Sequence, residues 1–118
     1  MKDISLKEAQ KVIDSWINKF EEGYWPPLSM LAAMVEEVGE LSRIINALEG
    51  YKKPKEDENL VNLEEELGDI LFSLICIANY YKIDLNTSLI NVIRKYNNRD
   101  IHRWTLKRKT EGNKKQMS

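Results

Sequence analysis

Hydrophobic residues recur at intervals of three and four over four segments of this chain, the spacing that places them on one face of an α-helix. The first segment opens with Ser5-Leu6-Lys7-Glu8, which fits a capping box, and predicts a helix over residues 5–21. Gly23 suits a C-cap, and Pro26-Pro27 cannot continue a helix. The next segment predicts a second helix over residues 28–48.

The remaining pattern predicts two further helices. Residues 51–60 are charged and aperiodic, so we expect an exposed loop there. Asn62 can cap a third helix that extends to about residue 81, with Glu64, Glu65 and Glu66 in its first turn. After a short turn at residues 82–84, a fourth helix is expected over 85–98. Strand alternation, internal repeats and glycine-rich phosphate loops are missing from the sequence, which predicts an all-α fold, a bundle of four helices.

The third predicted helix is apolar around its whole circumference over residues 70–78, as a helix buried on every side would be. The second has two apolar stripes on opposite sides. One consists of Leu31, Val35, Val38, Ile45 and Leu48, and the other of Ala33, Ile44 and Ala47. Four helices of one short chain can hardly cover all of this surface. We therefore expect a homo-oligomer, a dimer or tetramer, assembled through the second and third helices.

Composition limits the chemistry that this single domain can carry. A chain of 118 residues with 42% hydrophobic residues forms one ordinary core. One cysteine excludes an intramolecular disulfide and favours a reducing compartment, and no stretch is long enough to span a membrane, so a cytoplasmic protein without a membrane partner is expected. One histidine excludes any site that needs two imidazoles. If a metal binds, carboxylates must supply most of its ligands.

The net charge of −1 averages two unlike parts. Residues 105–118 contain five basic residues and one acid, which leaves thirteen basic and eighteen acidic residues in the rest of the chain. An acidic body is a poor general binder of nucleic acid, so no nucleic-acid partner is expected. We expect a folded domain over residues 1–106 and a basic, disordered tail over 107–118.

Acidic residues concentrate in two blocks, residues 36–40 and 64–69. Glu37 and Glu40 are three positions apart, as are Glu66 and Asp69, so each pair shares one helix face. On facing helices the two pairs would form an all-oxygen cage, the ligand set that Mg²⁺ prefers and that Mn²⁺ also accepts. The alternative is that these acids are ordinary surface or helix-terminal residues, which is the simpler interpretation for Glu64 and Glu65.

A glycine precedes the second acid of each pair, Gly39 before Glu40 and Gly68 before Asp69. Glycine inside a helix costs about 1 kcal/mol relative to alanine. Glycines at matching positions therefore suggest that the two helix backbones approach closely there, although packing glycines without a functional role are an alternative.

The pattern Glu-Glu-x-x-Glu at residues 36–40, followed after 25 residues by Glu-x-x-Asp at 66–69, resembles the signature of the MazG-like, all-α nucleotide pyrophosphohydrolase superfamily. The resemblance extends over residues 3–107. It includes Glu-Gly-Tyr-Trp at 22–25 and Lys-Tyr-Asn-Asn-Arg-Asp at 95–100. The chain is most similar in this respect to the small, single-domain bacterial MazG proteins, whose known members assemble as dimers or tetramers.

This resemblance implies hydrolysis of a nucleoside triphosphate between the α and β phosphates, giving the monophosphate and pyrophosphate. It implies Mg²⁺ ligation by Glu37, Glu40, Glu66 and Asp69. It makes Glu36 a candidate to orient or deprotonate the attacking water. It also implies phosphate contacts from Lys95 and Arg99, and a nucleotide contact from Asn98.

Two questions stay open at this level. Tyr24 and Trp25 could stack on a base or pack against the start of the second helix, and Trp25 is the candidate for substrate binding. The function could also be that of a phosphoribosyl-ATP pyrophosphohydrolase, which uses related motifs, or of a non-catalytic helical scaffold. The intact set of four carboxylates argues against the scaffold.

Overall fold

The computed structural model describes residues 2–51 and 59–108, apart from the side chains of residues 60 and 61. Over these ranges it contains four helices and no strand: α1 Leu6–Ile17, α2 Pro27–Leu48, α3 Leu60–Tyr80 and α4 Leu85–Asp100. The predicted all-α fold is therefore confirmed. The chain divides into two compact units, Met1–Asn86 and Thr87–Ser118, and each is described by itself. None of the described helices is both long and apolar enough to cross a membrane.

The predicted capping box begins α1. The Ser5 hydroxyl accepts a hydrogen bond from the Glu8 amide, and the Glu8 carboxylate accepts one from the Ser5 amide, both at 3.1 Å. These bonds hold the pKa of Glu8 below its usual value. The predicted end at residue 21 is wrong, since α1 ends at Ile17. The amides of Lys19 and Phe20 bond to carbonyls three residues back, so the chain tightens into turns before Gly23, whose φ is +60°.

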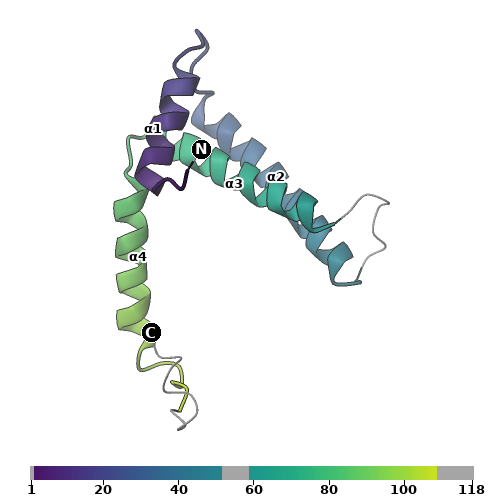
Figure 1. Ribbon diagram of the computed structural model, residues 1–118, viewed down its shortest axis with the longest axis vertical. Helices are drawn as coiled ribbons and strands as arrows, with labels where there is room; N and C mark the ends of the chain where they lie inside the picture. The colour runs from purple at the N-terminus through teal and green to yellow at the C-terminus, as the bar shows by residue number, and fades with distance from the viewer. Residues whose placement is uncertain (1, 52–58, 109–118) are drawn as a thin grey trace. The chain divides into compact units, whose positions relative to one another are not determined.

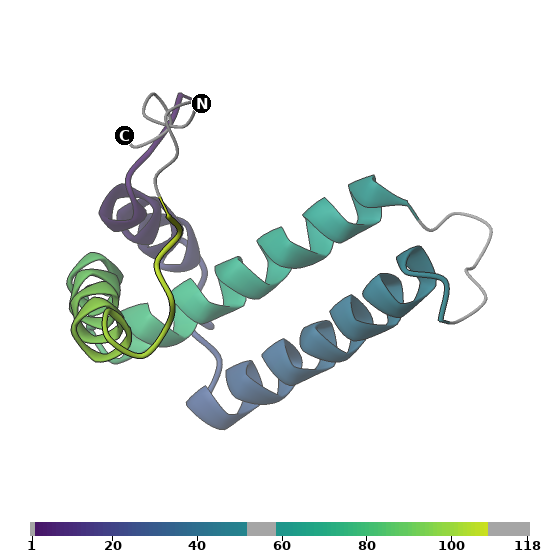
Figure 2. The same cartoon turned by 90° about the horizontal axis from the view of Figure 1, so that it is seen from below.

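The helices α2 and α3 form an antiparallel pair that contains most of the core (Figures 1 and 2). Pro27 occupies the first turn of α2, where its missing N–H costs nothing. The buried hydrophobic side chains come only from these two helices among the described residues. They are Met30, Ile44 and Ala47 from α2 and Ile75, Cys76 and Ala78 from α3.

The start of α3 differs from the prediction. The helix begins at Leu60, and Asn59 and Asn62 exchange hydrogen bonds between side-chain oxygen and backbone amide at 3.1 and 3.2 Å. Asn59 is therefore the N-cap, and Asn62 is the residue three positions later that bonds back to it. The first turn of α3 contains no acid. Glu66 accordingly lies further inside the helix, where the helix dipole gives no reason for a carboxylate.

A buried glutamine joins α1 to the end of α3. Gln10 is only 8% exposed, and its side-chain amide donates to the Asn79 side chain at 3.0 Å and to the Ile83 carbonyl at 2.8 Å. Its side-chain oxygen accepts from the Leu85 amide at 2.9 Å, at the start of α4. The turn between α3 and α4 contains Lys82 at φ 57°, a left-handed conformation.

The two apolar stripes of α2 differ in burial. The stripe with Ile44 and Ala47 packs in the core, whereas all five residues of the other stripe, Leu31, Val35, Val38, Ile45 and Leu48, are exposed. On α3, Leu67, Leu71 and Leu74 are also exposed, which agrees with the expectation that one chain cannot cover this helix on every side. A wide apolar surface along α2 and α3 is left uncovered by the described residues of the chain.

Candidate functional site

Three carboxylates meet between α2 and α3. Glu37 lies on α2, and Glu66 and Asp69 lie one turn apart on α3. One oxygen from each lies within 4.8 Å of the others. The antiparallel arrangement of α2 and α3 (Figure 2) allows residues about thirty positions apart in the sequence to come together. We refer to Glu37, Glu66 and Asp69 as the carboxylate cluster.

Three ionised carboxylates in the carboxylate cluster would repel one another. The pKa of Glu66 is raised to about 7 because its protonated form hydrogen-bonds to Glu37, because it is desolvated, and because Glu37, Asp69 and Glu40 repel its charge. Its Oε1 atom is buried and has no hydrogen-bond partner among the described groups. Buried polar atoms are normally paired. An unpaired carboxylate oxygen beside two further carboxylates fits a divalent cation, which would supply the missing positive charge.

The other acids of the two sequence blocks lie outside the carboxylate cluster. Glu40 accepts hydrogen bonds from Arg43, at 2.9 Å from Nη2 and 3.3 Å from Nε. Glu36 is exposed on α2.

The glycines beside these acids do not mark a close approach of helices. A Cβ atom built on either Gly39 or Gly68 would meet nothing within 4 Å among the described residues of the chain. The expectation that they allow the backbones of α2 and α3 to approach closely is therefore wrong within one chain.

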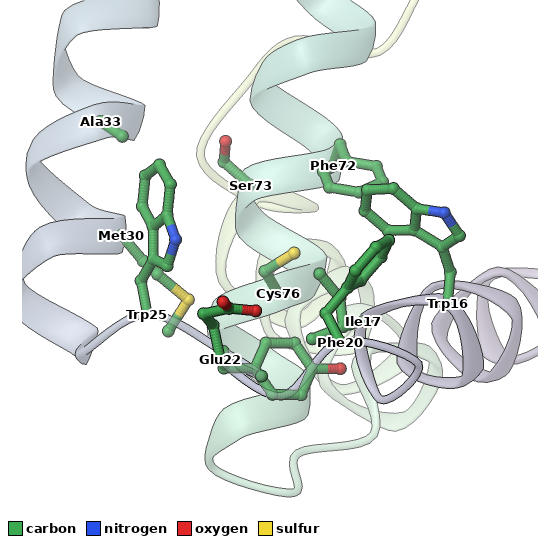
Figure 3. A pocket seen from close by; sticks show the side chains of 12 residues that line it. Trp16, Ile17, Phe20, Glu22, Trp25, Met30, Ala33, Phe72, Ser73 and Cys76 are labelled. Atoms are coloured by element: carbon green, nitrogen blue, oxygen red, sulfur yellow. The ribbon is translucent and has the colours of Figure 1, made fainter.

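A pocket of about 550 Å³ opens next to the carboxylate cluster. It lies between the end of α1, the turns that follow, the start of α2 and the middle of α3 (Figure 3). Five aromatic residues take part in the lining: Trp16, Phe20, Tyr24, Trp25 and Phe72. The size and the mainly apolar lining are within the range of pockets that bind small organic ligands.

Helical geometry connects the pocket to the carboxylate cluster. Ala33 lines the pocket and lies one turn before Glu37 on α2, and Ser73 lines it one turn after Asp69 on α3. The four residues of each step rise about 6 Å along the helix axis. The Ala33 and Ser73 end of the pocket therefore faces the carboxylates.

The turn that carries Trp25 is anchored by its neighbour. The Tyr24 hydroxyl donates a 2.6 Å hydrogen bond to the Asp14 carboxylate of α1. Burial and this bond raise the pKa of the Tyr24 hydroxyl. Tyr24 thus packs in place, whereas Trp25 is 62% exposed and presents its ring to the pocket (Figure 3). Stacking of Trp25 on a base stays a prediction.

The basic residues assigned to phosphate binding lie on α4, in the second unit. Lys95, Asn98 and Arg99 are all exposed. Arg99 forms two hydrogen bonds with Asp100, at 2.8 and 3.1 Å, which raise the pKa of Arg99 and lower that of Asp100. The Lys95 and Arg99 cations both lie over the ring of Tyr96, at 5.0 and 4.6 Å from its centroid. Their role toward a phosphate stays a prediction.

Similarity to known proteins identifies the family of this chain. The sequence profile of the MazG nucleotide pyrophosphohydrolase domain matches residues 26–104, which cover α2, α3, α4 and the proposed ligands. The chain belongs to this family.

Particular relatives agree with the family. The protein YpjD of Bacillus subtilis is 45% identical over 112 residues, which are 95% of this chain and 99% of the relative. YvdC of the same organism is 28% identical over 70% of this chain and 83% of its own length. A crystal structure of YpjD, proposed there to be a pyrophosphatase, superposes with a TM-score of 0.75 at 42% identity and covers 82% of this chain and 99% of that one. The Bacillus-conserved MazG protein, a nucleotide pyrophosphohydrolase, gives a TM-score of 0.70 at 42% identity over 82% and 94% of the two chains.

Sequence reasoning missed most of the pocket. Phe20, Glu22, Met30, Phe72 and Cys76 line it, and none of them was assigned a role. Phe72 and Cys76 lie in the apolar run of α3, from which the sequence predicted only burial. Phe20 was expected inside the first helix, but α1 ends at Ile17, so Phe20 lies in the turn that follows. The one usable signal was the density of aromatic residues from Trp16 to Trp25 around an unusual turn.

Proposed function

We propose that this protein is a Mg²⁺-dependent nucleoside triphosphate pyrophosphohydrolase, which cleaves ribo- or deoxyribonucleoside triphosphates between the α and β phosphates. The observation that carries the proposal is the carboxylate cluster, with its unpaired buried oxygen, one helical turn from a pocket large enough for a nucleoside. Membership of the MazG family and the likeness to a nucleotide pyrophosphohydrolase support it. Removal of non-canonical or excess nucleotides would be its cellular role, in the cytoplasm.

The donor set fits a hard divalent cation. Glu37, Glu66 and Asp69 would hold Mg²⁺, or Mn²⁺ in its place, and Glu40 would join them by exchanging its contact with Arg43. When bound, the cation would neutralise phosphate oxygens and acidify a bound water. Glu36, exposed one position before Glu37, would orient or deprotonate the water.

The remaining residues would bind the substrate. Trp25 presents an exposed ring at the pocket and would stack on the nucleobase. Lys95 and Arg99 would neutralise phosphate charge, and Asn98 would donate or accept a hydrogen bond. A homo-oligomer, dimer or tetramer, would cover the exposed apolar surface of α2 and α3.

The test is pyrophosphate release by the purified protein with Mg²⁺. The substrate panel contains normal and modified ribo- and deoxyribonucleoside triphosphates together with phosphoribosyl-ATP. We expect turnover of nucleoside triphosphates that stops when a chelator removes the metal. Glu37→Gln is expected to lower kcat/KM by about 100-fold or more, because the bound cation contributes several kcal/mol to the reaction.

The matched control is Glu65→Gln, which removes an exposed acid of α3 outside the carboxylate cluster. It should keep near-normal kcat/KM. Normal turnover by Glu37→Gln, or release of pyrophosphate by no member of the panel, would contradict the proposed function. Preference for phosphoribosyl-ATP would assign the protein to that reaction instead.

A further inference from the structure

Glu22 is the one charged side chain among the described residues that line the pocket. It lies in the turn after α1, and its carboxylate extends into the space between Trp25 and Cys76 (Figure 3). Neither lysine nor arginine takes part in the described lining to neutralise it. The proposed hydrolysis itself gives this carboxylate no role.

The place of Glu22 within the pocket decides what it can meet. Figure 3 shows Ala33 and Ser73 at one end of the pocket and Glu22 at the other, near Cys76. Cys76 follows Asp69 by seven residues on α3, about 10 Å along the helix axis. A nucleotide with its phosphates at the carboxylate cluster and its sugar between Ala33 and Ser73 would direct the far edge of its base toward Glu22.

An ionised carboxylate only accepts hydrogen bonds, through two oxygens side by side. The indole N–H groups of Trp16 and Trp25 and the Ser73 hydroxyl also line the pocket, and none of these described groups forms a hydrogen bond with Glu22. The Tyr24 hydroxyl already donates to Asp14, and the Cys76 thiol, whose pKa is raised by burial, is a weak donor. The base must therefore bring the donors that Glu22 lacks.

The pairing edges of the common bases differ in this respect. Guanine presents N1–H and the 2-amino group as two adjacent donors, which match both carboxylate oxygens. Adenine and cytosine present one amino donor next to a ring-nitrogen acceptor, and thymine and uracil present one N–H between two carbonyl oxygens. Acceptors facing the carboxylate would be repelled.

We propose that Glu22 is a specificity-determining residue that selects nucleotides with a guanine-type edge, through paired hydrogen bonds from N1–H and the 2-amino group. This proposal rests on the proposed function, since it uses the same pocket and the same direction of the phosphates. The aromatic walls then bind any base, and Glu22 discriminates among them.

The sharpest probe is the pair dGTP and dITP, which differ only in the 2-amino group. We expect the wild-type protein to favour dGTP by about tenfold in kcat/KM. The preference is smaller than in a closed site because Glu22 is exposed and water replaces a lost donor. Glu22→Gln should reduce the ratio to near one, since an amide offers one acceptor and one donor.

Glu21→Gln is the matched control, because Glu21 is an adjacent exposed acid that does not line the pocket. It should keep the preference of the wild type. Equal kcat/KM for dGTP and dITP in the wild type, or an unchanged ratio in Glu22→Gln, would overturn the proposal.

A binding measurement separates this proposal from the proposed function. Trp16 and Trp25 line the pocket, so their fluorescence should report binding of the monophosphates dGMP and dIMP without any turnover. Tighter binding of dGMP that Glu22→Gln abolishes would support the role of Glu22 even if no triphosphate is hydrolysed. Turnover of triphosphates with equal binding of the two monophosphates would overturn the role of Glu22 and leave the proposed function standing.

Discussion

Glu66 shows at the scale of one residue how a site can oppose the stability of its own fold. Its carboxylate lies beside Glu37 and Asp69, has a buried oxygen without a hydrogen-bond partner, and has a pKa of about 7. Without a cation the protein must either protonate this group or tolerate the repulsion. A residue that costs stability in this way is typical of a functional position.

The pH dependence of stability follows from the direction of that shift. The pKa of Glu66 lies above its ordinary value of 4.5, so between about pH 4.5 and 7 the folded state binds more protons than the unfolded state. Its contribution to stability is therefore present at low pH and is lost as the pH rises through 7. We expect Glu66→Gln to raise the Tm at pH 8 in the presence of a chelator, and to have little effect near pH 4.5.

Thermal unfolding with and without Mg²⁺ checks this prediction. The cation should raise the Tm of the wild type at pH 8 and leave that of Glu66→Gln almost unchanged. Glu65→Gln, which alters an exposed acid outside the carboxylate cluster, controls for the change in net charge. A lower Tm for Glu66→Gln than for the wild type at pH 8 in chelator would show that the ionised Glu66 does not destabilise the fold.

At the scale of elements, sequence periodicity predicted the helices better than their ends. Four helices were expected and four are present in the described residues. The ends of α1 and α3 differ because hydrogen bonds outside the pattern decide them. Short-range turns after Ile17 end α1, and the Asn59–Asn62 exchange begins α3 earlier than Asn62. The expected loop over residues 51–60 lies largely outside the described residues, as does the tail from residue 109.

The joint between α1 and the end of α3 depends on Gln10. Replacing it by alanine would leave the Leu85 amide, the Ile83 carbonyl and the Asn79 side-chain oxygen without their partner. We expect Gln10→Ala to lower the free energy of unfolding by about 2 kcal/mol, because it removes three hydrogen bonds from part-buried groups. Urea denaturation measures this, with the exposed neighbour in Lys11→Ala as control. A loss no larger than that of the control would show that the joint is not held by Gln10.

At the scale of the whole molecule, the apolar surface along α2 and α3 is the feature that one chain leaves unexplained. Its residues repeat at helical spacing over most of the length of α2, which favours a long partner rather than a small ligand. Among the candidate partners, a second copy of the same chain is the one that the sequence already predicts.

Light scattering coupled to size exclusion tests the assembly. Val35 is 59% exposed at the middle of this surface, so Val35→Glu should cost a single chain little and should convert an oligomer to monomers. Val12→Glu, a similar change on α1, should leave the mass unchanged. A monomeric mass for the wild type would refute the assembly, and an oligomer that persists in Val35→Glu would refute the role of this surface.

The sequence by itself determined the helices, their apolar faces and the carboxylate pairs, because all of these depend on residues within one or two turns of each other. It also predicted the family, which the match of residues 26–104 to the MazG domain confirmed. Only the tertiary structure decided that Glu37 lies beside Glu66 and Asp69. It also decided that Glu40 bonds to Arg43, and that Glu22, Trp25 and Phe72 line the same pocket. These contacts depend on the register of the two antiparallel helices and on the residue at which α1 ends. Neither can be read from a local sequence pattern.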